Sequence, residues 1–324
     1  MRAVLCKTLG EPEGLVVEDV PSPTPAAGEV KIAVHAAGLN FGDILIVQGK
    51  YQEKPELPFT PGMELSGTVT ALGKGVEHLA MGDTVIAMTG TGAFAEDVVT
   101  DANWVLKVPA SVDLRAAAAF PVAYGTSHLA LEHRADLHQG EVLLVLGASG
   151  GVGLTAVEIG KAMGATVIAC ASSPEKLQVA AKYGADHGID YSYENIRDRV
   201  RELTGGADVV YDPVGGDVFQ QALSSINWEG RLIVIGFASG TIQKIPSNYV
   251  LLKNCSVMGV LWGAYRRRDP KPMRASLATL IDWLTEGKIT PHISHELPLE
   301  KAGEALRLMM DRKSTGKVVL TTGR

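Results

Sequence analysis

Cysteine is scarce in this sequence: Cys6, Cys170 and Cys255 stand far apart among 324 residues. Three scattered cysteines cannot form a disulfide framework, and without a Cys-x-x-Cys pair or a Cys/His cluster they indicate no structural zinc site. The eight histidines show no metal-ligand spacing either. The composition predicts an enzyme-sized chain in a reducing, cytoplasmic compartment.

Long apolar runs and a strong excess of one charge are also missing. Nowhere do 18 apolar residues follow one another, and the amino-terminal residues lack a long apolar run, so we expect neither a membrane span nor a signal peptide. With 30 basic and 36 acidic residues the formal charge is −6, which argues against nucleic acid or an anionic membrane as partner. A hydrophobic share of 46% with 20% charged residues indicates a globular protein of two or three domains.

The pattern of apolar runs changes along the chain. Residues 1–120 are predicted to be β-rich, with short strands separated by Gly, Pro and Asp turns. From about Tyr124, strands alternate with helices, which is typical of parallel strands joined by crossover helices. The predicted strands are Val30–Ala36, Leu65–Ala71, Thr84–Met88, Trp104–Val108, Val142–Leu146, Thr166–Ala169, Val209–Tyr211, Arg231–Ile235 and Ser256–Val260, and the clearest helices are Val152–Met163 and Pro174–Tyr183.

The tail has a different order of elements. Two helices, Pro272–Thr285 and Leu299–Met310, precede one strand, Lys317–Thr321. A strand this late can return to the first domain, which would make that domain discontinuous.

A glycine-rich turn follows the predicted strand Val142–Leu146. Gly147, Gly150, Gly151 and Gly153 lie between this strand and an amphipathic helix, although Ala148 replaces the first glycine of the GxGxxG fingerprint. Glycine lets a pyrophosphate approach the backbone, and the helix N-terminus offers it free N–H groups. We therefore expect Gly150, Gly151 and Val152 to bind a dinucleotide.

The end of the next strand indicates which dinucleotide. NAD sites usually place a carboxylate there, to accept from the ribose 2′-hydroxyl. This chain has Ser172, Ser173 and Lys176 instead, and Glu175 should lie one turn into the following helix. Hydroxyls and an ammonium favour a 2′-phosphate, so the sequence favours NADP(H), with a merely solvated Lys176 as the alternative.

With these residues in view, the chain resembles the medium-chain dehydrogenase/reductase superfamily, and within it the zinc-free quinone oxidoreductase branch that includes ζ-crystallin. The resemblance runs end to end and rests on the glycine turn and on four further segments: residues 36–43 (AAGLNFGD), 61–69 (PGMELSGTV), 208–216 (DVVYDPVGG) and 316–320 (GKVVL).

This resemblance implies an α/β fold with two domains. A doubly wound parallel Rossmann sheet would occupy residues 123–262. A GroES-like, β-rich catalytic domain would be formed by residues 1–122 together with 263–324. The resemblance also implies a homodimer.

The same resemblance implies metal-free chemistry. Zinc-dependent members place a cysteine where Asn40 stands and a histidine where Met63 stands, and Glu64 alone cannot hold zinc. We therefore expect an NADPH-dependent reductase that passes hydride to a small electrophilic acceptor, a quinone or an α,β-unsaturated carbonyl.

The site residues follow from the resemblance, position by position. Asn40, Tyr51 and Trp262 would orient the substrate, although a turn-forming Asn40 and a core Trp262 are the alternatives. No residue stands out as an indispensable acid or base, and Leu45 replaces a second family tyrosine. The expected cofactor-binding residues are Asn40, Thr126, Gly150, Gly151, Val152, Ser172, Lys176, Tyr191, Phe237, Ala238, Val260, Trp262 and Arg312, the last with a solvated charge as the alternative.

Two other functions stay open. The run Arg266–Arg268 suits the phosphates of a coenzyme A thioester, which would make the protein an enoyl-thioester reductase; a solvated turn is the alternative. The second is a non-catalytic NADPH-binding protein, disfavoured in its nucleic-acid-binding form by the net charge.

Overall fold

Two large β-sheets organise the chain in the computed structural model, which describes residues 1–324. Its contacts divide the chain into a first unit, Met1–Val122 with Thr290–Arg324, and a second unit, Ala123–Ile289. The first unit is discontinuous. The division differs from the expected one at residues 263–289, which belong to the second unit.

The physical reason for this difference is the packing of helix α10 (Pro270–Thr285). Its residues Met273, Leu277 and Leu280 are buried, and its Ser276 hydroxyl hydrogen-bonds His128 Nδ1 at 2.9 Å. His128 ends helix α3 (Pro121–His128) of the second unit, so α10 adds its apolar face to the core of that unit.

The second unit is a doubly wound α/β domain whose six strands are all parallel, in the order β10-β9-β8-β11-β12-β13. Counted along the unit this is 3-2-1-4-5-6, the order of dinucleotide-binding sheets. None of its helices, nor any other in the protein, has the length and apolar character that a membrane crossing requires. The strands are β8 (Val142–Leu146), β9 (Thr166–Ala171), β10 (His187–Asp190), β11 (Ala207–Asp212), β12 (Ile226–Val234) and β13 (Ser256–Gly259).

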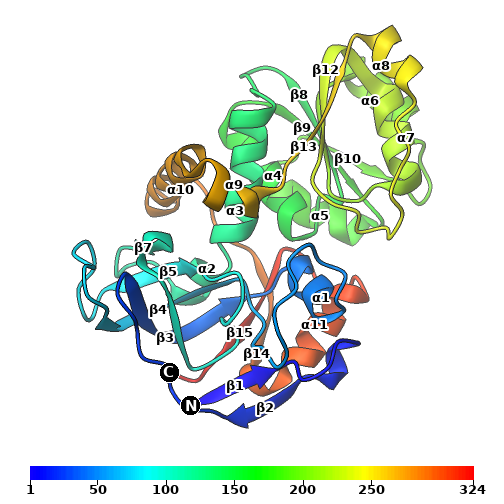
Figure 1. Ribbon diagram of the computed structural model, residues 1–324. Helices are drawn as coiled ribbons and strands as arrows, with labels where there is room; N and C mark the ends of the chain where they lie inside the picture. Colours follow the sequence, from blue (N-terminus) through cyan, green and yellow to red (C-terminus); the bar gives the residue numbers. More distant parts are fainter. The chain divides into compact units, whose positions relative to one another are not determined.

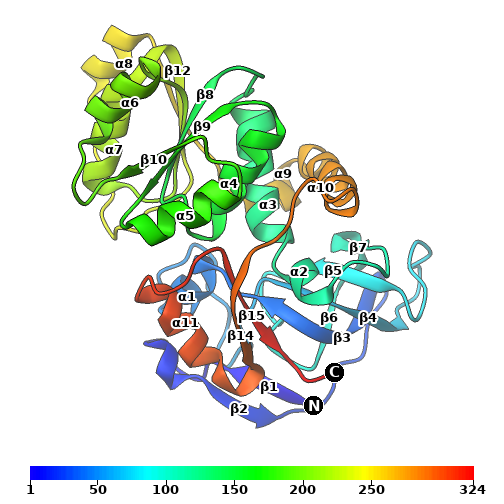
Figure 2. The ribbon, with the colours of Figure 1, turned by 180° about the vertical axis from the view of Figure 1, so that it is seen from behind.

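Helices cover both faces of this sheet. Its strands are apolar on both faces, so both faces need to be shielded from water. Figures 1 and 2 show α4 and α5 on one face and α6, α7 and α8 on the other. Besides α3 and α10, the helices are η3 (Leu129–Arg134), α4 (Gly151–Ala162), α5 (Pro174–Lys182), α6 (Ile196–Thr204), α7 (Gly216–Ser225), α8 (Ser247–Lys253), η4 (Trp262–Ala264) and α9 (Tyr265–Arg268).

The first unit is built on a mostly antiparallel sheet in the order β14-β15-β3-β4-β5-β7, with β6 also paired to β3 and a separate pair β1-β2. Its strands are β1 (Arg2–Leu5), β2 (Val16–Asp19), β3 (Glu29–Gly38), β4 (Glu64–Leu72), β5 (Thr84–Met88), β6 (Asp97–Asp101), β7 (Val105–Lys107), β14 (Ile293–Pro298) and β15 (Lys317–Thr321). Its helices are η1 (Pro12–Gly14), α1 (Phe41–Val47), η2 (Ala102–Trp104), α2 (Leu114–Ala118), η5 (Leu299–Lys301) and α11 (Ala302–Met310).

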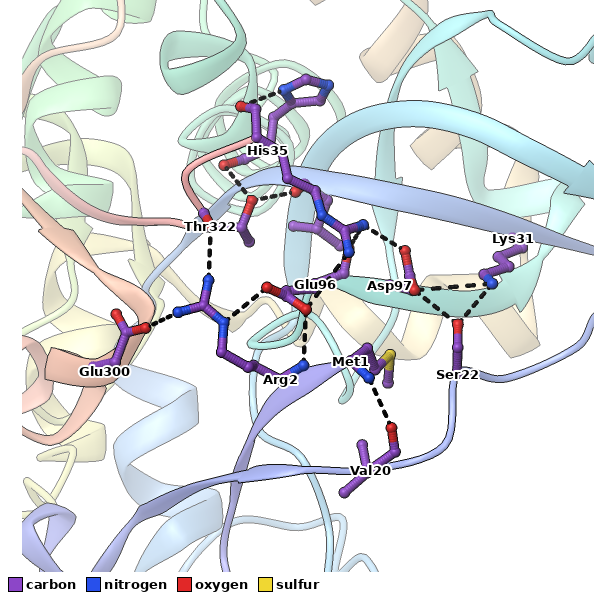
Figure 3. Close-up of polar contacts among 12 residues, drawn as sticks. Met1, Arg2, Val20, Ser22, Lys31, His35, Glu96, Asp97, Glu300 and Thr322 are labelled. Atoms are coloured by element: carbon purple, nitrogen blue, oxygen red, sulfur yellow. Dashed lines mark hydrogen bonds and ion pairs between the residues drawn. The ribbon is translucent and has the colours of Figure 1, made fainter.

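Both ends of the chain lie in the first unit. The strand predicted at Lys317–Thr321 is confirmed as β15, and it pairs antiparallel with β3 through Val319 and Gly38. Figure 3 shows how polar contacts join the ends: Arg2 Nε donates to Glu96 at 2.8 Å, and Arg2 also donates to the Thr322 carbonyl at 3.2 Å and to Glu300. The last strand therefore lies in the larger sheet of the first unit, and these polar contacts tie it to the first residues of the chain.

Candidate active site

The glycine-rich turn lies where β8 passes into α4. Gly147 has a left-handed backbone (φ 59°), and Gly150 caps α4. A Cβ on Gly153 would come within 2.1 Å of the Gly147 carbonyl oxygen, so α4 packs against the turn more closely than any other residue permits. A Cβ on Gly150 would meet only that same oxygen, at 3.4 Å. The turn therefore leaves the cap of α4 open, as a bound pyrophosphate requires.

Two side chains meet at the carboxyl end of β9. Lys176 Nζ donates to Ser172 Oγ at 3.3 Å, while Ser173 caps α5 by accepting from the Lys176 backbone N–H. Glu175 bonds to Ser173, which lowers the pKa of that carboxyl. Tyr191 follows β10, and its backbone N–H bonds the Ala171 carbonyl at 3.1 Å. A hydroxyl and an ammonium thus meet at the end of β9, and neither Ala171, which ends the strand, nor Ser172 or Ser173 after it carries a carboxylate.

The loops after β11 and β12 are joined to each other. Ala238 N–H donates to the Pro213 carbonyl at 3.0 Å. Asp212, fully buried, accepts two backbone N–H groups of its own loop through Oδ1, and burial raises the pKa of this carboxyl. The side chain of Phe237, by contrast, is 40% exposed. This junction holds Phe237 and Ala238 at the carboxyl edge of the sheet, where doubly wound folds bind nucleotides.

Trp262 lies just beyond β13, and its indole packs against the middle of α3. A Cβ on Gly125 would come within 2.6 Å of the indole ring, so the glycine makes room for it. The indole is buried, and its N–H has no hydrogen-bond partner within the protein. Thr126 and Val260 are buried beside these residues in the sequence. This burial agrees with both interpretations of Trp262, as a core residue and as a wall of the substrate pocket.

Asn40 in the first unit is part of a buried polar cluster. Its Nδ2 donates to Glu64 Oε1 at 2.8 Å, and its Oδ1 accepts from Lys317 Nζ at 2.7 Å. Lys317 also pairs with Glu64 Oε1 at 2.8 Å, with side chains only 4% and 0% exposed. Gly38 leaves the space for Glu64, since a Cβ there would come within 2.6 Å of the carboxylate. The amide is thus engaged at both ends rather than loosely exposed.

Asp43 adds a second carboxyl to this cluster. Its Oδ2 accepts from the Asn40 backbone N–H at 2.8 Å, while its Oδ1 is buried without a partner. Burial raises the pKa of Asp43 to about 7, because its effect outweighs the backbone hydrogen bonds and the attraction of Lys317, which both lower the pKa. At neutral pH a large fraction of Asp43 therefore holds its proton.

The donor set at this place does not suit zinc. The positions expected to differ from zinc-dependent proteins carry Asn40 and Met63. Of the two carboxyl groups, Glu64 is bound by an ammonium and Asp43 accepts from the Asn40 backbone N–H. Nowhere in the chain do three His, Cys, Asp or Glu side chains gather in an arrangement able to hold a metal ion. Zinc needs three or four such ligands, so these residues do not form a zinc site.

Two further expected residues, Tyr51 and Arg312, belong to the first unit. Tyr51 is half-buried beside Met63, and burial raises the pKa of its hydroxyl. Arg312 is exposed after α11, with a left-handed backbone (φ 56°). Strained backbone of this kind is concentrated at functional sites.

The structure thus brings together some expected residues and not others. It joins Ser172 to Lys176 and the glycines to α4. The single buried polar cluster of Asn40, Glu64, Lys317 and Asp43 was not predicted from the sequence. The sequence did carry a signal for it, because Glu64 and Lys317 are each the first and only charged residue of their strands β4 and β15. Two surface cavities, of about 300 Å³ between α6, α7 and α8 and about 370 Å³ beside α2 and β14, contain none of the expected residues.

Two family models match the sequence. The model described as an alcohol dehydrogenase GroES-like domain covers residues 26–110, and the model described as a zinc-binding dehydrogenase covers residues 151–285. The two matches fall in the first and the second unit respectively.

Individual relatives match over nearly the whole chain. A quinone oxidoreductase-like protein 2 homolog of Nematostella vectensis is 45% identical over 99% of this chain and 89% of its own length. Escherichia coli quinone oxidoreductase, solved in complex with NADPH, superposes with a TM-score of 0.91 at 28% identity, over 99% of this chain and 100% of that one. The Thermus thermophilus quinone oxidoreductase, also solved with NADPH, gives 0.87 at 33% identity over the same shares.

Proposed function

The chain belongs to the zinc-free quinone oxidoreductase branch of the medium-chain dehydrogenase/reductase superfamily, and from this we propose that it is an NADPH-dependent reductase of quinones or other α,β-unsaturated carbonyl compounds. The observation that carries the proposal is the pairing of Lys176 with Ser172 at the end of β9, where a carboxylate would be needed for NAD(H).

The residues of the second unit fit NADPH. The turn at Gly150, Gly151 and Val152, with α4 behind it, would hold the pyrophosphate on backbone N–H groups. Ser172, Lys176 and Tyr191 would bind the 2′-phosphate and the adenosine. Phe237, Ala238, Val260, Trp262 and Thr126 would line the nicotinamide half. Once bound, NADPH supplies hydride.

The residues of the first unit would act on the acceptor. Asn40 and Tyr51 each carry a group able to donate a hydrogen bond to a carbonyl oxygen. No titratable side chain is needed as an acid, because a quinone or enone oxygen that has gained charge can take its proton from solvent. The chain's own contribution is therefore orientation and charge stabilisation.

One specific feature keeps an enoyl-thioester acceptor as a second candidate. Arg266, Arg267 and Arg268 form α9, and Lys271 and Arg274 follow at the start of α10. Five cations within nine residues contrast with the net charge of −6, and such a group suits the phosphates of coenzyme A. If the thioester is the substrate, alanine at all three arginines should raise its KM strongly and leave the KM of a quinone unchanged.

We also propose a homodimer in the cytoplasm. The outermost strand β13 leaves one edge of the sheet unpaired, and nearby Leu251 and Leu252 of α8 are 78% and 71% exposed. An open strand edge with apolar neighbours is self-complementary about a twofold axis. The three cysteines are all unpaired and buried, which suits a reducing compartment.

Steady-state assays test the main proposal. NADPH and NADH are compared with 1,4-naphthoquinone, an alkenal and crotonyl-coenzyme A as acceptors, and we expect turnover that prefers NADPH. Binding of NADPH with no turnover across a wide acceptor panel would favour a non-catalytic NADPH-binding protein instead.

A matched pair of variants tests the cofactor assignment. Lys176→Ala should weaken NADPH binding by about 1–2 kcal/mol, because it removes a charge-assisted contact to the 2′-phosphate, and should leave NADH binding unchanged. Lys182→Ala, at the exposed far end of α5, serves as the control. An unaltered preference for NADPH over NADH in Lys176→Ala would refute the assignment.

A further inference from the structure

The two neighbours of the Asn40 side chain determine which way its amide is turned. Lys317 Nζ lies 2.7 Å from one end and Glu64 Oε1 lies 2.8 Å from the other. An ammonium can only donate a hydrogen bond, and an ionised carboxylate can only accept one. The amide oxygen must therefore face Lys317 and the amide nitrogen must face Glu64. If the amide were turned over, two donors would face each other at Lys317 and two acceptors would face each other at Glu64.

Once these bonds are made, Asn40 has one N–H left. The first N–H of Nδ2 belongs to Glu64, and Oδ1 lies against an ammonium. The whole residue is only 8% exposed. Toward any ligand that reaches it, Asn40 can therefore offer a hydrogen-bond donor in one fixed direction, and it is poorly suited to accept.

Lys317 itself has no N–H left for a ligand. An ammonium carries three N–H groups, and Lys317 has three acceptors: the Leu39 carbonyl at 2.5 Å, Asn40 Oδ1 at 2.7 Å and Glu64 Oε1 at 2.8 Å. Its residue is 3% exposed. Whatever Lys317 does for a reaction, it must do through the groups that it holds.

We propose that Lys317 is a positioning residue for hydride transfer, which with Glu64 holds Asn40 so that its remaining amide N–H donates to the oxygen of the hydride acceptor. This inference rests on the proposed function. The acceptor carbon gains a hydride and its two electrons from NADPH, the electron pair displaced from the acceptor's π system settles on its oxygen, and a solvent proton completes the product. A fixed donor stabilises the charged oxygen more than the neutral carbonyl, so it lowers the barrier rather than tightening ground-state binding.

Chemical rescue separates this role from a merely structural one. Lys317→Ala leaves a space in which propylammonium can replace the missing three carbons and ammonium. We expect kcat to fall roughly 10- to 100-fold with KM for the acceptor and Kd for NADPH nearly unchanged, and propylammonium, but not the uncharged 1-propanol of the same size, to restore part of kcat. A rise in KM with kcat unchanged, or equal effects of propylammonium and 1-propanol, would overturn the proposal.

Coupling to Asn40 gives a second, independent test. In an Asn40→Ala background, further loss of Lys317 should lower kcat by less than twofold, because the group that Lys317 positions is already gone. If the double variant instead loses kcat by the product of the two single-variant factors, the result would contradict the proposal. If Lys317→Ala does not fold, the neutral pair Lys317→Met with Glu64→Gln replaces it, since no unpaired buried charge remains; full kcat in this double variant would also contradict the proposal.

The controls keep this inference apart from the proposed function. Lys301→Met removes an exposed lysine of the same unit and should leave kcat unchanged. If the unmodified protein reduces no acceptor with NADPH, the proposed function itself fails. If it does so and Lys317 variants keep full kcat with Asn40 intact, only the role of Lys317 fails.

Discussion

Lys317 and Glu64 form an ion pair that water hardly reaches, and its energetics differ from those of an exposed pair. Lys317→Met leaves Glu64 buried without its cation, so we expect a loss of about 3–5 kcal/mol in the free energy of unfolding. Adding Glu64→Gln should recover much of it. Lys301→Met, which breaks the exposed pair with Glu304 at 2.9 Å, should cost less than about 1 kcal/mol. Urea unfolding of the four proteins measures these values, and equal losses for the two lysines would contradict the expectation.

Asp43 should make stability depend on pH. Its pKa is raised to about 7 in the folded state by burial, with Lys317 opposing and Glu64 reinforcing this shift, so between about pH 4 and pH 7 the folded state binds a proton that the unfolded state releases. Stability from this group is therefore complete below about pH 4 and is lost as the pH rises through about 7.

Thermal unfolding of the parent and of Asp43→Asn between pH 4 and pH 8 tests this. The buried His128, whose pKa is lowered to about 4 by burial, acts in the opposite direction, because its contribution is lost as the pH falls below about 6.5. The informative quantity is thus the difference between the two proteins, which should shrink as the pH rises. A difference that is constant with pH would show that Asp43 does not titrate in this window.

Whether a contact between two side chains can be predicted depends on how far apart they lie in the sequence. Ser172 and Lys176 are four residues apart around a strand end, so their meeting follows from local geometry alone. Lys317 is 253 residues from Glu64, and the two meet only because β15 and β4 both pair with β3, at Gly38. The charge of each was visible in the sequence, but the sheet register that joins them was not.

The turn between β8 and α4 allows a test at the level of one element. Gly153→Ala places a Cβ 2.1 Å from a backbone oxygen, and we expect a loss of about 1–3 kcal/mol in the free energy of unfolding. Gly150→Ala meets that oxygen at an ordinary 3.4 Å, with an unstrained φ of −79°, and should unfold like the parent. Because its methyl group would fill the approach to the helix cap, it should instead weaken NADPH binding, roughly tenfold or more.

Chemical denaturation and NADPH titration of both variants separate the two effects. If both variants bind NADPH as tightly as the parent, the turn does not bind the pyrophosphate. Equal destabilisation of both would show that the close packing at Gly153 is not special.

Element boundaries were predictable where apolar runs end at clear turns. The predicted strands Val142–Leu146, Thr84–Met88 and Lys317–Thr321 match β8, β5 and β15 residue for residue. Strand β12 begins at Ile226 rather than Arg231, because polar residues such as Glu229 continue the strand where no apolar pattern marks it. The side on which α10 packs was not predictable, since an amphipathic helix fits any apolar surface.

At the scale of the whole molecule, the unpaired edge of β13 predicts self-association. Glutamate at both Leu251 and Leu252 puts charges beside this edge, and we expect the dimer to dissociate to a monomer that keeps its fold. Sedimentation velocity measures the change, and circular dichroism checks the fold. Met81→Glu, at a solitary apolar residue that is 70% exposed in the first unit, is the matched control. A parent that sediments as a monomer would refute the proposed dimer.

The pairing of β15 with β3 also constrains how the protein is made. The second unit is one continuous segment, Ala123–Ile289, so every residue that it needs has left the ribosome while the tail is still being synthesised. The first unit begins earlier and finishes later, because Gly38 must wait for Val319, and contacts so distant in sequence form slowly. During synthesis the first unit therefore completes its sheet after the second unit is whole, and residues 36–38 of β3 lack their β15 partner until the last strand arrives. An unpaired strand edge of this kind promotes aggregation.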